Sequence, residues 1–219
     1  MATGVPRLDG LSCAPYFEGQ GMTSDARHKL LELLAKYAYD YKPGAYKLAS
    51  GIVSDEYLDC KEALSQPAAQ EAVGDLFLMN LDTRAVAVGG LTMGADPIAI
   101  NTARSGSSNG RPLRWFCVRK VAKEHGRKKI IEGAVQPGES VVVVDDVVTK
   151  GGSTVEAIQK CRAHGLKVIQ VLVLVDREQG GLQAIKEEAG EGVEVRAIFT
   201  KAEVSREWEA RRQTLRATA

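Results

Sequence analysis

Residues 141–154, VVVVDDVVTKGGST, bring together more chemically active groups than any other stretch of the sequence. Four valines form an apolar run that is typical of a buried strand. Two adjacent carboxylates, Asp145 and Asp146, follow it directly. Like charges at this separation repel one another, so a partner must compensate them. The cis-diol of a sugar can donate a hydrogen bond to each carboxylate, and a nearby metal ion would add positive charge. The pair therefore predicts recognition of vicinal hydroxyls.

The loop that follows the aspartates suits a phosphate group. Gly151 and Gly152 permit backbone conformations, and a close ligand approach, that a Cβ atom would prevent. The helix expected to begin there has unpaired N–H groups at its first turn, and hydroxyls from Thr149, Ser153 and Thr154 add donors. The loop matches neither G-x-x-x-x-G-K-[S/T] nor G-x-G-x-x-G. A helix N-cap with a spare acid would explain either pair of residues alone, whereas the whole string predicts a site for ribose 5-phosphate.

This string resembles the motif with which type I phosphoribosyltransferases bind 5-phosphoribosyl-1-diphosphate (PRPP). That motif is an apolar strand, two acids, a short apolar pair and a T-x-G-x-[S/T] loop. The resemblance implies catalytic roles for both aspartates and leaves Lys150 with no role beyond positive charge beside the phosphate. The PRPP-binding residues that it implies are Asp145, Asp146, Val147, Val148, Thr149, Lys150, Gly151, Gly152, Ser153 and Thr154.

A basic segment, RKVAKEHG at 119–126, is the second unusual feature. Arg119, Lys120, Lys123 and His125 cannot share one helical face, so the segment is either a solvated basic loop or a mobile loop that gathers its cations on a ligand. Departure of pyrophosphate from PRPP builds negative charge, which cations stabilise. A loop that closes also excludes water.

The basic segment resembles the R-K-x-x-K-x-H-G signature of the orotate phosphoribosyltransferase family. The resemblance implies a flexible loop over about 119–133, in which Lys123 is the main catalytic side chain and His125 and Arg119 assist. It also implies that these three residues and Lys120 bind PRPP. In that family the loop reaches into the neighbouring subunit, so a homodimer with shared sites is expected.

Two further stretches are similar to the base-binding parts of the same family. LVDREQGG at 174–181 fits a D-R-x-x-x-G pattern, and a guanidinium pairs well with a carboxylate, which assigns Arg177 to the carboxylate of orotate. A surface turn with a local ion pair is the alternative. LASGIVSDEYLD at 48–59 fits S-G-x-x-S-x-x-Y-x-D, which implies that Tyr57 stacks on the base, unless it is a half-buried strand tyrosine. The remaining orotate-binding residues implied are Ser50, Lys47 and Thr149.

The chain also departs from the family in two of these stretches. Many members have lysine where this chain has Ala49; Lys47 would lie on the same face of a strand. AVGGLTMGADPIA at 87–99 fits the family's pyrophosphate loop, but the Tyr-Lys pair of some members is Thr92-Met93 here. Because this loop carries less positive charge, Mg²⁺ and the cations of the basic segment must stabilise more of the negative charge on the pyrophosphate. The pyrophosphate-loop residues are Gly90, Thr92 and Gly94.

Apolar runs alternate with helical patterns along the chain, which predicts an α/β fold with a mainly parallel sheet flanked by helices. Pairs Gly89-Gly90, Asp145-Asp146 and Asp176-Arg177 should meet at the carboxyl edge of this sheet. We expect an N-terminal arm (1–22) and a single domain (23–219) with a small hood (about 23–65). The first helix should begin at Ser24 and end at Pro43-Gly44, followed by a hairpin or extended loop around residues 50–54. The other expected elements are strands at 84–90, 113–120, 140–145, 167–175 and 193–199, and helices at 67–80, 94–105, 153–164, 180–190 and 201–216.

Composition restricts the function classes. The 219 residues carry a net charge of +1, with 44% hydrophobic and 26% charged residues, so no nucleic-acid or membrane partner is indicated. We expect a cytoplasmic protein, because the N-terminus lacks the pattern of a signal peptide. Four scattered cysteines predict neither disulfides nor a zinc site. Mg²⁺ should bind through PRPP oxygens and water, with no direct protein ligand expected except Asp146.

The function that the resemblance implies is that of the orotate phosphoribosyltransferase family, whose members convert orotate and PRPP to orotidine 5′-monophosphate and pyrophosphate in de novo UMP synthesis. Two alternatives stay open. One is a phosphoribosyltransferase of the same fold for another base, such as a purine or uracil. The other is a PRPP-sensing, non-enzymatic regulator that binds RNA, although a net charge of +1 gives it little support.

Overall fold

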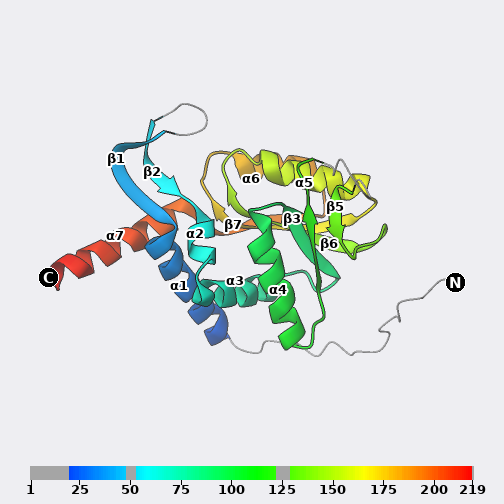
Figure 1. Ribbon diagram of the computed structural model, residues 1–219, viewed down its shortest axis with the longest axis horizontal. Helices are drawn as coiled ribbons and strands as arrows, with labels where there is room; N and C mark the ends of the chain where they lie inside the picture. The colour runs from blue at the N-terminus through cyan, green and yellow to red at the C-terminus, as the bar shows by residue number, and fades with distance from the viewer. Residues whose placement is uncertain (1–19, 48–52, 122–128, 219) are drawn as a thin grey trace.

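The computed structural model describes residues 20–47, 53–121 and 129–218. A central sheet of six strands has the order β5-β4-β3-β6-β7-β8, and strands β1 and β2 form a separate hairpin (Figure 1). In the central sheet every neighbouring pair is parallel except β4 with β5. The predicted α/β class with a mainly parallel sheet is therefore confirmed. The strands are β1 (Tyr39–Lys47), β2 (Val53–Leu58), β3 (Ala87–Leu91), β4 (Arg114–Val118), β5 (Ile131–Gly133), β6 (Ser140–Val148), β7 (Lys167–Asp176) and β8 (Glu194–Thr200).

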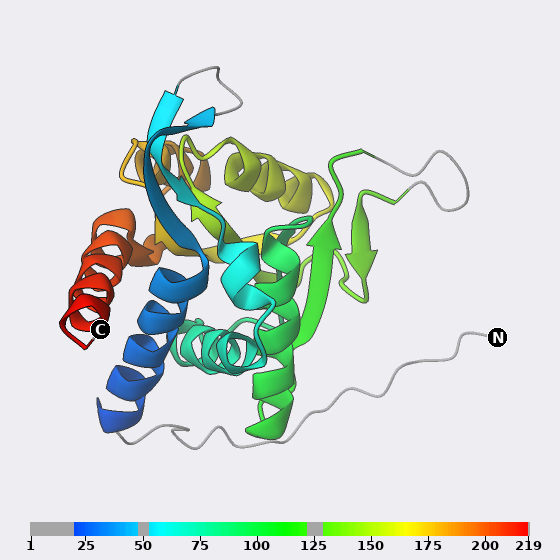
Figure 2. The ribbon, with the colours of Figure 1, turned by 60° about the vertical axis from the view of Figure 1, so that its left-hand side comes forward.

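Helices cover both faces of the central sheet. On one face lie α1, α3 and α4 with the short α2, and on the other lie α5 and α6, while α7 runs beside α1 (Figure 2). Strand β6 shows why its valine run is required. Val142 and Val144 belong to the core under α1, α3 and α4, whereas Val141 and Val143 belong to the core under α5 and α6. A strand buried on both faces needs apolar side chains at every position. The helices are α1 (Gln20–Tyr37), α2 (Cys60–Leu64), α3 (Pro67–Asn80), α4 (Ala95–Ser108), α5 (Gly152–Ala163), α6 (Gly181–Ala189) and α7 (Lys201–Ala217).

The β1–β2 hairpin is fixed to the rest of the molecule through α7. The ring of Tyr39 packs edge-on against Trp208 with centroids 5.5 Å apart. The Tyr39 hydroxyl donates to Glu56, which also pairs with Lys201 at the first turn of α7. These contacts hold the hairpin, and with it the segment that leads into α2, over the carboxyl edge of the sheet.

The first helix differs from its prediction at both ends. It begins at Gln20 rather than Ser24, so residues 20–22 of the expected arm are helical, and it ends at Tyr37. Pro43 and Gly44 do not end this helix; they lie inside β1, where the pairing with β2 shifts its register. An edge strand tolerates proline at such an irregularity because no ladder hydrogen bond is needed there. The predicted hairpin is confirmed, with its turn outside the described residues.

Three other differences concern short elements and one strand end. Helix α2 has five residues and β5 has three, too few for a periodic pattern to develop. Strand β6 was expected to end at residue 145, but it continues to Val148 because pairing with β7 persists through Val148 and Asp176. The two aspartates therefore lie within the strand and take fixed, opposite directions. The predicted helix at 67–80 is confirmed at both ends.

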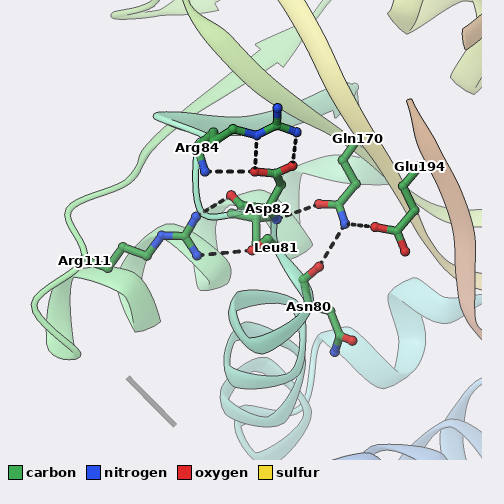
Figure 3. A network of polar contacts seen from close by, with 7 residues as sticks. All are labelled: Asn80, Leu81, Asp82, Arg84, Arg111, Gln170 and Glu194. Atoms are coloured by element: carbon green, nitrogen blue, oxygen red, sulfur yellow. Dashed lines mark hydrogen bonds and ion pairs between the residues drawn. The ribbon is translucent and has the colours of Figure 1, made fainter. Parts of the chain in front are cut away.

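The buried side-chain amide of Gln170 joins several segments on the side of the sheet opposite the two aspartates (Figure 3). The Gln170 side chain on β7 accepts a hydrogen bond from the backbone N–H of Asp82 at 2.8 Å. Its Nε2 atom donates to the carbonyl of Asn80 at 3.0 Å and to Glu194 at 2.7 Å. Arg111 donates to the carbonyl of Asp82 from the far side of the same turn. One glutamine thus joins the end of α3 to β7 and β8.

Replacing Gln170 with leucine should destabilise the protein. The change leaves the partly buried N–H of Asp82 without its acceptor, and the carbonyl of Asn80 keeps only a long hydrogen bond from Arg196. A buried polar group left without a partner costs about 1–3 kcal/mol. We expect Gln170→Leu to lower the free energy of unfolding by about 2 kcal/mol or more, as measured by urea denaturation. Gln159→Leu is the matched control, because Gln159 also donates to a glutamate, Glu188, but at an exposed position. Equal stability of the two variants would contradict the role given to this network.

Candidate functional site

The strand order places a topological switch point at the carboxyl edge between β3 and β6. From β3 the chain continues to β4 on one side, whereas β6 is followed by β7 and β8 on the other. Loops that leave neighbouring strands in opposite directions open a ligand crevice in sheets of this kind. The segments that follow β3, β4, β6 and β7 all lie at this edge. They contain the residues that the sequence singled out.

Asp145 is buried and its oxygens are already hydrogen-bonded. Its Oδ2 atom accepts from the hydroxyls of Ser153 at 2.8 Å and Thr154 at 2.7 Å, and its Oδ1 accepts from the N–H of Asp146. Burial raises the pKa of Asp145 to about 6; the charge of Asp146 adds to the rise and the two hydroxyls oppose it. Asp145 therefore anchors the loop to the strand.

Two expectations concern the same groups. Asp145 is expected to meet the hydroxyls of a sugar, and Ser153 and Thr154 are expected to donate to a phosphate; both expectations stay predictions. In the structure the two hydroxyls donate to Asp145, because the strand places its carboxylate under the first turn of α5. The backbone N–H groups at this helix end are further donors to an anion.

Asp146 points toward a different set of groups. Its Oδ1 accepts from the N–H of Val147 at 2.8 Å, and its Oδ2 lies 3.5 Å from the ammonium nitrogen of Lys61 on α2. Lys61 also lies 2.7 Å from Asp59, the N-cap of that helix. Burial alone would lower the pKa of Lys61, but the hydrogen bond to Asp59 and the charges of Asp146 and Asp59 raise it above its usual value.

Lys61 was missed by sequence reasoning. It lies two residues after the aspartate of the S-G-x-x-S-x-x-Y-x-D stretch, and that closeness was the only available signal. Nothing in the local pattern distinguishes a lysine that reaches a distant strand from one that stays in solvent.

Gly94 packs directly on the two aspartates. A Cβ atom at this position would lie 2.4 Å from Oδ1 of Asp146, closer than van der Waals contact permits, and 3.2 Å from Oδ1 of Asp145, a tight contact. The close approach requires glycine and brings the loop after β3 against the carboxylates. Thr92 in the same loop donates its hydroxyl to Asp96 at 2.7 Å, and the Thr92–Met93 peptide bond is cis.

Gly90 lies near the end of strand β3, as expected, and its role in a pyrophosphate loop stays a prediction. A Cβ atom there would lie 2.1 Å from the carbonyl oxygen of Val144. Packing within the sheet therefore requires glycine at position 90.

The loop between β6 and α5 is shaped by Gly151, whose φ of +82° favours glycine. A Cβ atom on Gly152 would meet no atom within 4 Å, so a group of ligand size has room beside this helix end. Lys150, expected only to add positive charge beside the phosphate, donates to the carbonyl of Gln179 at 3.1 Å. It ties this loop to the one that follows β7. Val148 is buried and Val147 is partly buried.

Arg177 follows β7, and its backbone N–H donates to the carbonyl of Val148 at 2.9 Å. Its Nε atom is buried and has no hydrogen-bond partner among the described residues. Across from it, burial would raise the pKa of Glu56. Hydrogen bonds from Lys201 and Tyr39, with the charges of Lys201 and Arg177, instead lower it below the usual value. A buried guanidinium donor without a partner is a group that an anionic acceptor would satisfy.

Tyr57 stacks on Tyr46 of the neighbouring strand, with ring centroids 5.3 Å apart and an angle of 23° between the planes. It is 44% exposed. Its ring thus has one aromatic partner and an accessible remainder. Lys123, His125 and Ser50 lie outside the described residues, as does the side chain of Lys47.

The start of the basic segment is held by a lysine that the sequence did not single out. The ammonium group of Lys160 on α5 donates to the carbonyls of Arg119 and Lys120, each at 2.8 Å, and pairs with Glu156. The N–H of Arg119 donates to the carbonyl of Ile130 at 2.8 Å, which joins the two ends of the segment. Lys120 is exposed and Arg119 is partly exposed.

Comparisons with known proteins agree with this arrangement, although no protein-family model matches the chain. An orotate phosphoribosyltransferase of Aquifex aeolicus (strain VF5) is 38% identical over 180 residues, which cover 81% of this chain and 97% of the relative. The crystal structure of Mycobacterium tuberculosis H37Rv orotate phosphoribosyltransferase in complex with Fe(III) dicitrate superposes with a TM-score of 0.69 at 34% identity. That match covers 82% of this chain and 98% of the other.

A second structure of the M. tuberculosis enzyme, in complex with PRPP, superposes with a TM-score of 0.63 at 29% identity and covers 82% of this chain and 92% of the other. The fold is the type I phosphoribosyltransferase fold, as predicted. Since a relative at 38% identity is matched over nearly its whole length, this chain belongs to the orotate phosphoribosyltransferase family.

Proposed function

We propose that this protein transfers the 5-phosphoribosyl group of PRPP to orotate, giving orotidine 5′-monophosphate and pyrophosphate in de novo pyrimidine synthesis. One structural observation supports the proposal in addition to family membership. At the β3–β6 switch point, Gly94 packs on Asp146 while the glycine loop before α5 is fastened to Asp145. A pyrophosphate loop, a diol acceptor and a phosphate loop are thereby adjacent.

PRPP binds along this edge with its 5′-phosphate at the first turn of α5. Helix N–H groups and the open space beside Gly152 suit a dianion. Asp146 accepts hydrogen bonds from the ribose hydroxyls, because among the described residues its Oδ2 atom is engaged by a single ion pair, at 3.5 Å. Asp145 keeps its role as the anchor of the loop.

Orotate binds where β7 ends. Its carboxylate meets the guanidinium of Arg177, whose buried Nε otherwise has no acceptor, and the ring stacks against Tyr57. Lys47, Ser50 and Thr149 complete the base pocket. Orotate is already an anion, so positioning and charge stabilisation at C1 dominate over general-base chemistry.

Cations of the basic segment stabilise the departing pyrophosphate. Lys123 is the main group, assisted by Arg119, Lys120 and His125. The clamp formed by Lys160 supports this assignment, since it fixes the start of the segment while the residues beyond it reach the site.

The site fits Mg²⁺ delivered with PRPP. Asp146 offers a hard carboxylate oxygen at the edge of the site. No group of three histidine, cysteine or acidic side chains in the described ranges could hold the ion alone. Mg²⁺ would neutralise charge on the pyrophosphate. Asp146 is the residue that would touch the ion, and PRPP oxygens and water would supply its other ligands.

We expect a homodimer in which the segment at about 119–133 serves the neighbouring site, with residues 23–65 as a hood over each site. Large apolar side chains on the adjacent α4 and β4 support an interface there: Ile100 is 42% exposed and Trp115 44%. We expect the cytoplasm as its location. None of the helices described is both long enough and apolar enough to span a membrane.

Turnover with a panel of bases tests the proposed function. With PRPP and Mg²⁺ present, orotate should give a nucleotide and pyrophosphate, whereas uracil, adenine and hypoxanthine should give none, because they lack a carboxylate for Arg177. Product from another base without product from orotate would contradict the proposal. Tight RNA binding without PRPP consumption would instead favour a regulator.

Mixed dimers test the shared site. Lys123→Ala and Asp146→Asn should each be nearly inactive alone. After subunit exchange, half of the sites in a mixed dimer would combine an intact loop with an intact carboxylate, so part of the activity should return. Exchange is followed with a mass-tagged subunit. Complete exchange without recovered activity would show that each site is built within one chain.

A further inference from the structure

Lys61 is the described residue whose position is least explained by the proposed function. It follows the β1–β2 hairpin on the short helix α2, and its ammonium group lies between two carboxylates. The nitrogen is 2.7 Å from Oδ1 of Asp59 and 3.5 Å from Oδ2 of Asp146. The side chain is 47% exposed, whereas that of Asp146 is 11% exposed.

The two distances have different meanings. At 2.7 Å the ammonium is in close contact with Asp59, whereas 3.5 Å to Asp146 is at the outer limit of a hydrogen bond and makes that contact the weaker one. An ammonium has three donors, so Lys61 keeps donor capacity on the side that faces Asp146. A hydroxyl in contact with both groups could donate to the carboxylate and accept from the ammonium.

Asp146 alone would pair with the hydrogen of a hydroxyl group but not with its oxygen. An ionised carboxylate accepts but cannot donate, so it engages the hydrogen and leaves the oxygen lone pairs unused. The neighbouring groups supply no strong donor. Asp145 and Asp59 are acids. Cys60 is a buried thiol whose pKa is raised, first by burial and then by the charges of Asp146 and Asp59, so it stays a neutral and weak S–H donor. Among the described residues, Lys61 is the cation paired with Asp146.

We propose that Lys61 binds substrate in the ribose subsite, donating a hydrogen bond to a ring hydroxyl that itself donates to Asp146. The inference deepens the proposed function and rests on it, since it assumes that a ribose phosphate occupies the edge beside Asp146. It also connects two parts of the site. Lys61 lies on the segment that carries Tyr57, so the ribose contact fixes the base-binding hairpin against β6.

A purely structural Lys61 is the opposing account. An exposed pair between Asp59 and Lys61, two residues apart on the helix N-terminus, would contribute little to stability and nothing to sugar recognition. The two accounts differ in whether Lys61 distinguishes sugars by their hydroxyls.

The experiment measures binding of ribose 5-phosphate, 2-deoxyribose 5-phosphate and 3-deoxyribose 5-phosphate by calorimetry, without metal. The wild type should prefer ribose 5-phosphate to at least one deoxy sugar. Lys61→Met should weaken the binding of ribose 5-phosphate about tenfold, because the variant loses a hydrogen bond to a charged group. The same variant should change binding of that deoxy sugar little, so the preference is lost. Lys61→Arg keeps the charge and the donors and should retain part of the preference for ribose 5-phosphate.

Lys29→Met is the matched control. Lys29 is 50% exposed and pairs with Glu71 on α3 at 3.6 Å, so it resembles Lys61 in exposure and pairing but lies on α1. The Lys29→Met variant should bind all three sugars with the same affinities as the wild type. Should Lys61→Met not fold, as judged by thermal unfolding, Lys61→Ala makes the same test.

Two results would overturn the proposal. Equal weakening of all three sugars would mean that Lys61 acts through its charge alone, and an unchanged preference would mean that it does not touch the sugar. Turnover of orotate by the wild type is measured in parallel. Absence of that turnover counts against the proposed function, whereas loss of discrimination in Lys61→Met is judged on binding alone.

Discussion

Two adjacent carboxylates buried on one strand are the constraint on which this structure depends. An ionised carboxylate taken out of water is costly unless hydrogen bonds or an opposite charge compensate it. Pleating sends the side chains of Asp145 and Asp146 to opposite faces of β6, so each finds different compensation. Asp145 receives two hydroxyls and a backbone N–H. Asp146 receives one N–H and the ammonium of Lys61.

This division organises the surrounding loops. Because Asp145 takes the hydroxyls at the start of α5, the glycine loop has a fixed position over the end of the strand. Because Asp146 lies at the carboxyl edge, the loop after β3 packs on it closely, and glycine at position 94 permits this approach. Lys150 and Lys160 then fasten the neighbouring loops through backbone carbonyls. The site is thus carried by the sheet, and the Gln170 network stiffens that sheet on its other side.

Local patterns predicted much of the fold and the location of the site. The valine run marked the central strand, Pro67 marked the start of α3, and glycines and acids at strand ends marked the functional edge. Local patterns failed where long-range contacts decide. Lys61 and Lys160 look like ordinary helix lysines, and their partners are far away in sequence. Pro43 was misassigned because edge strands accept proline only in a tertiary setting that a local pattern does not contain.

The central claim is that the two aspartates have separate roles, with Asp146 binding the sugar and Asp145 holding the loop. Urea denaturation of Asp145→Ala and Asp146→Ala, with Mg²⁺ and with or without PRPP, tests it most directly, because a ligand stabilises only a protein that binds it. Without PRPP, Asp145→Ala should unfold at lower urea than Asp146→Ala, since three donors lose their acceptor. With PRPP, Asp145→Ala should still be stabilised and Asp146→Ala should not. The reverse pattern, or the same response in both variants, would contradict the account.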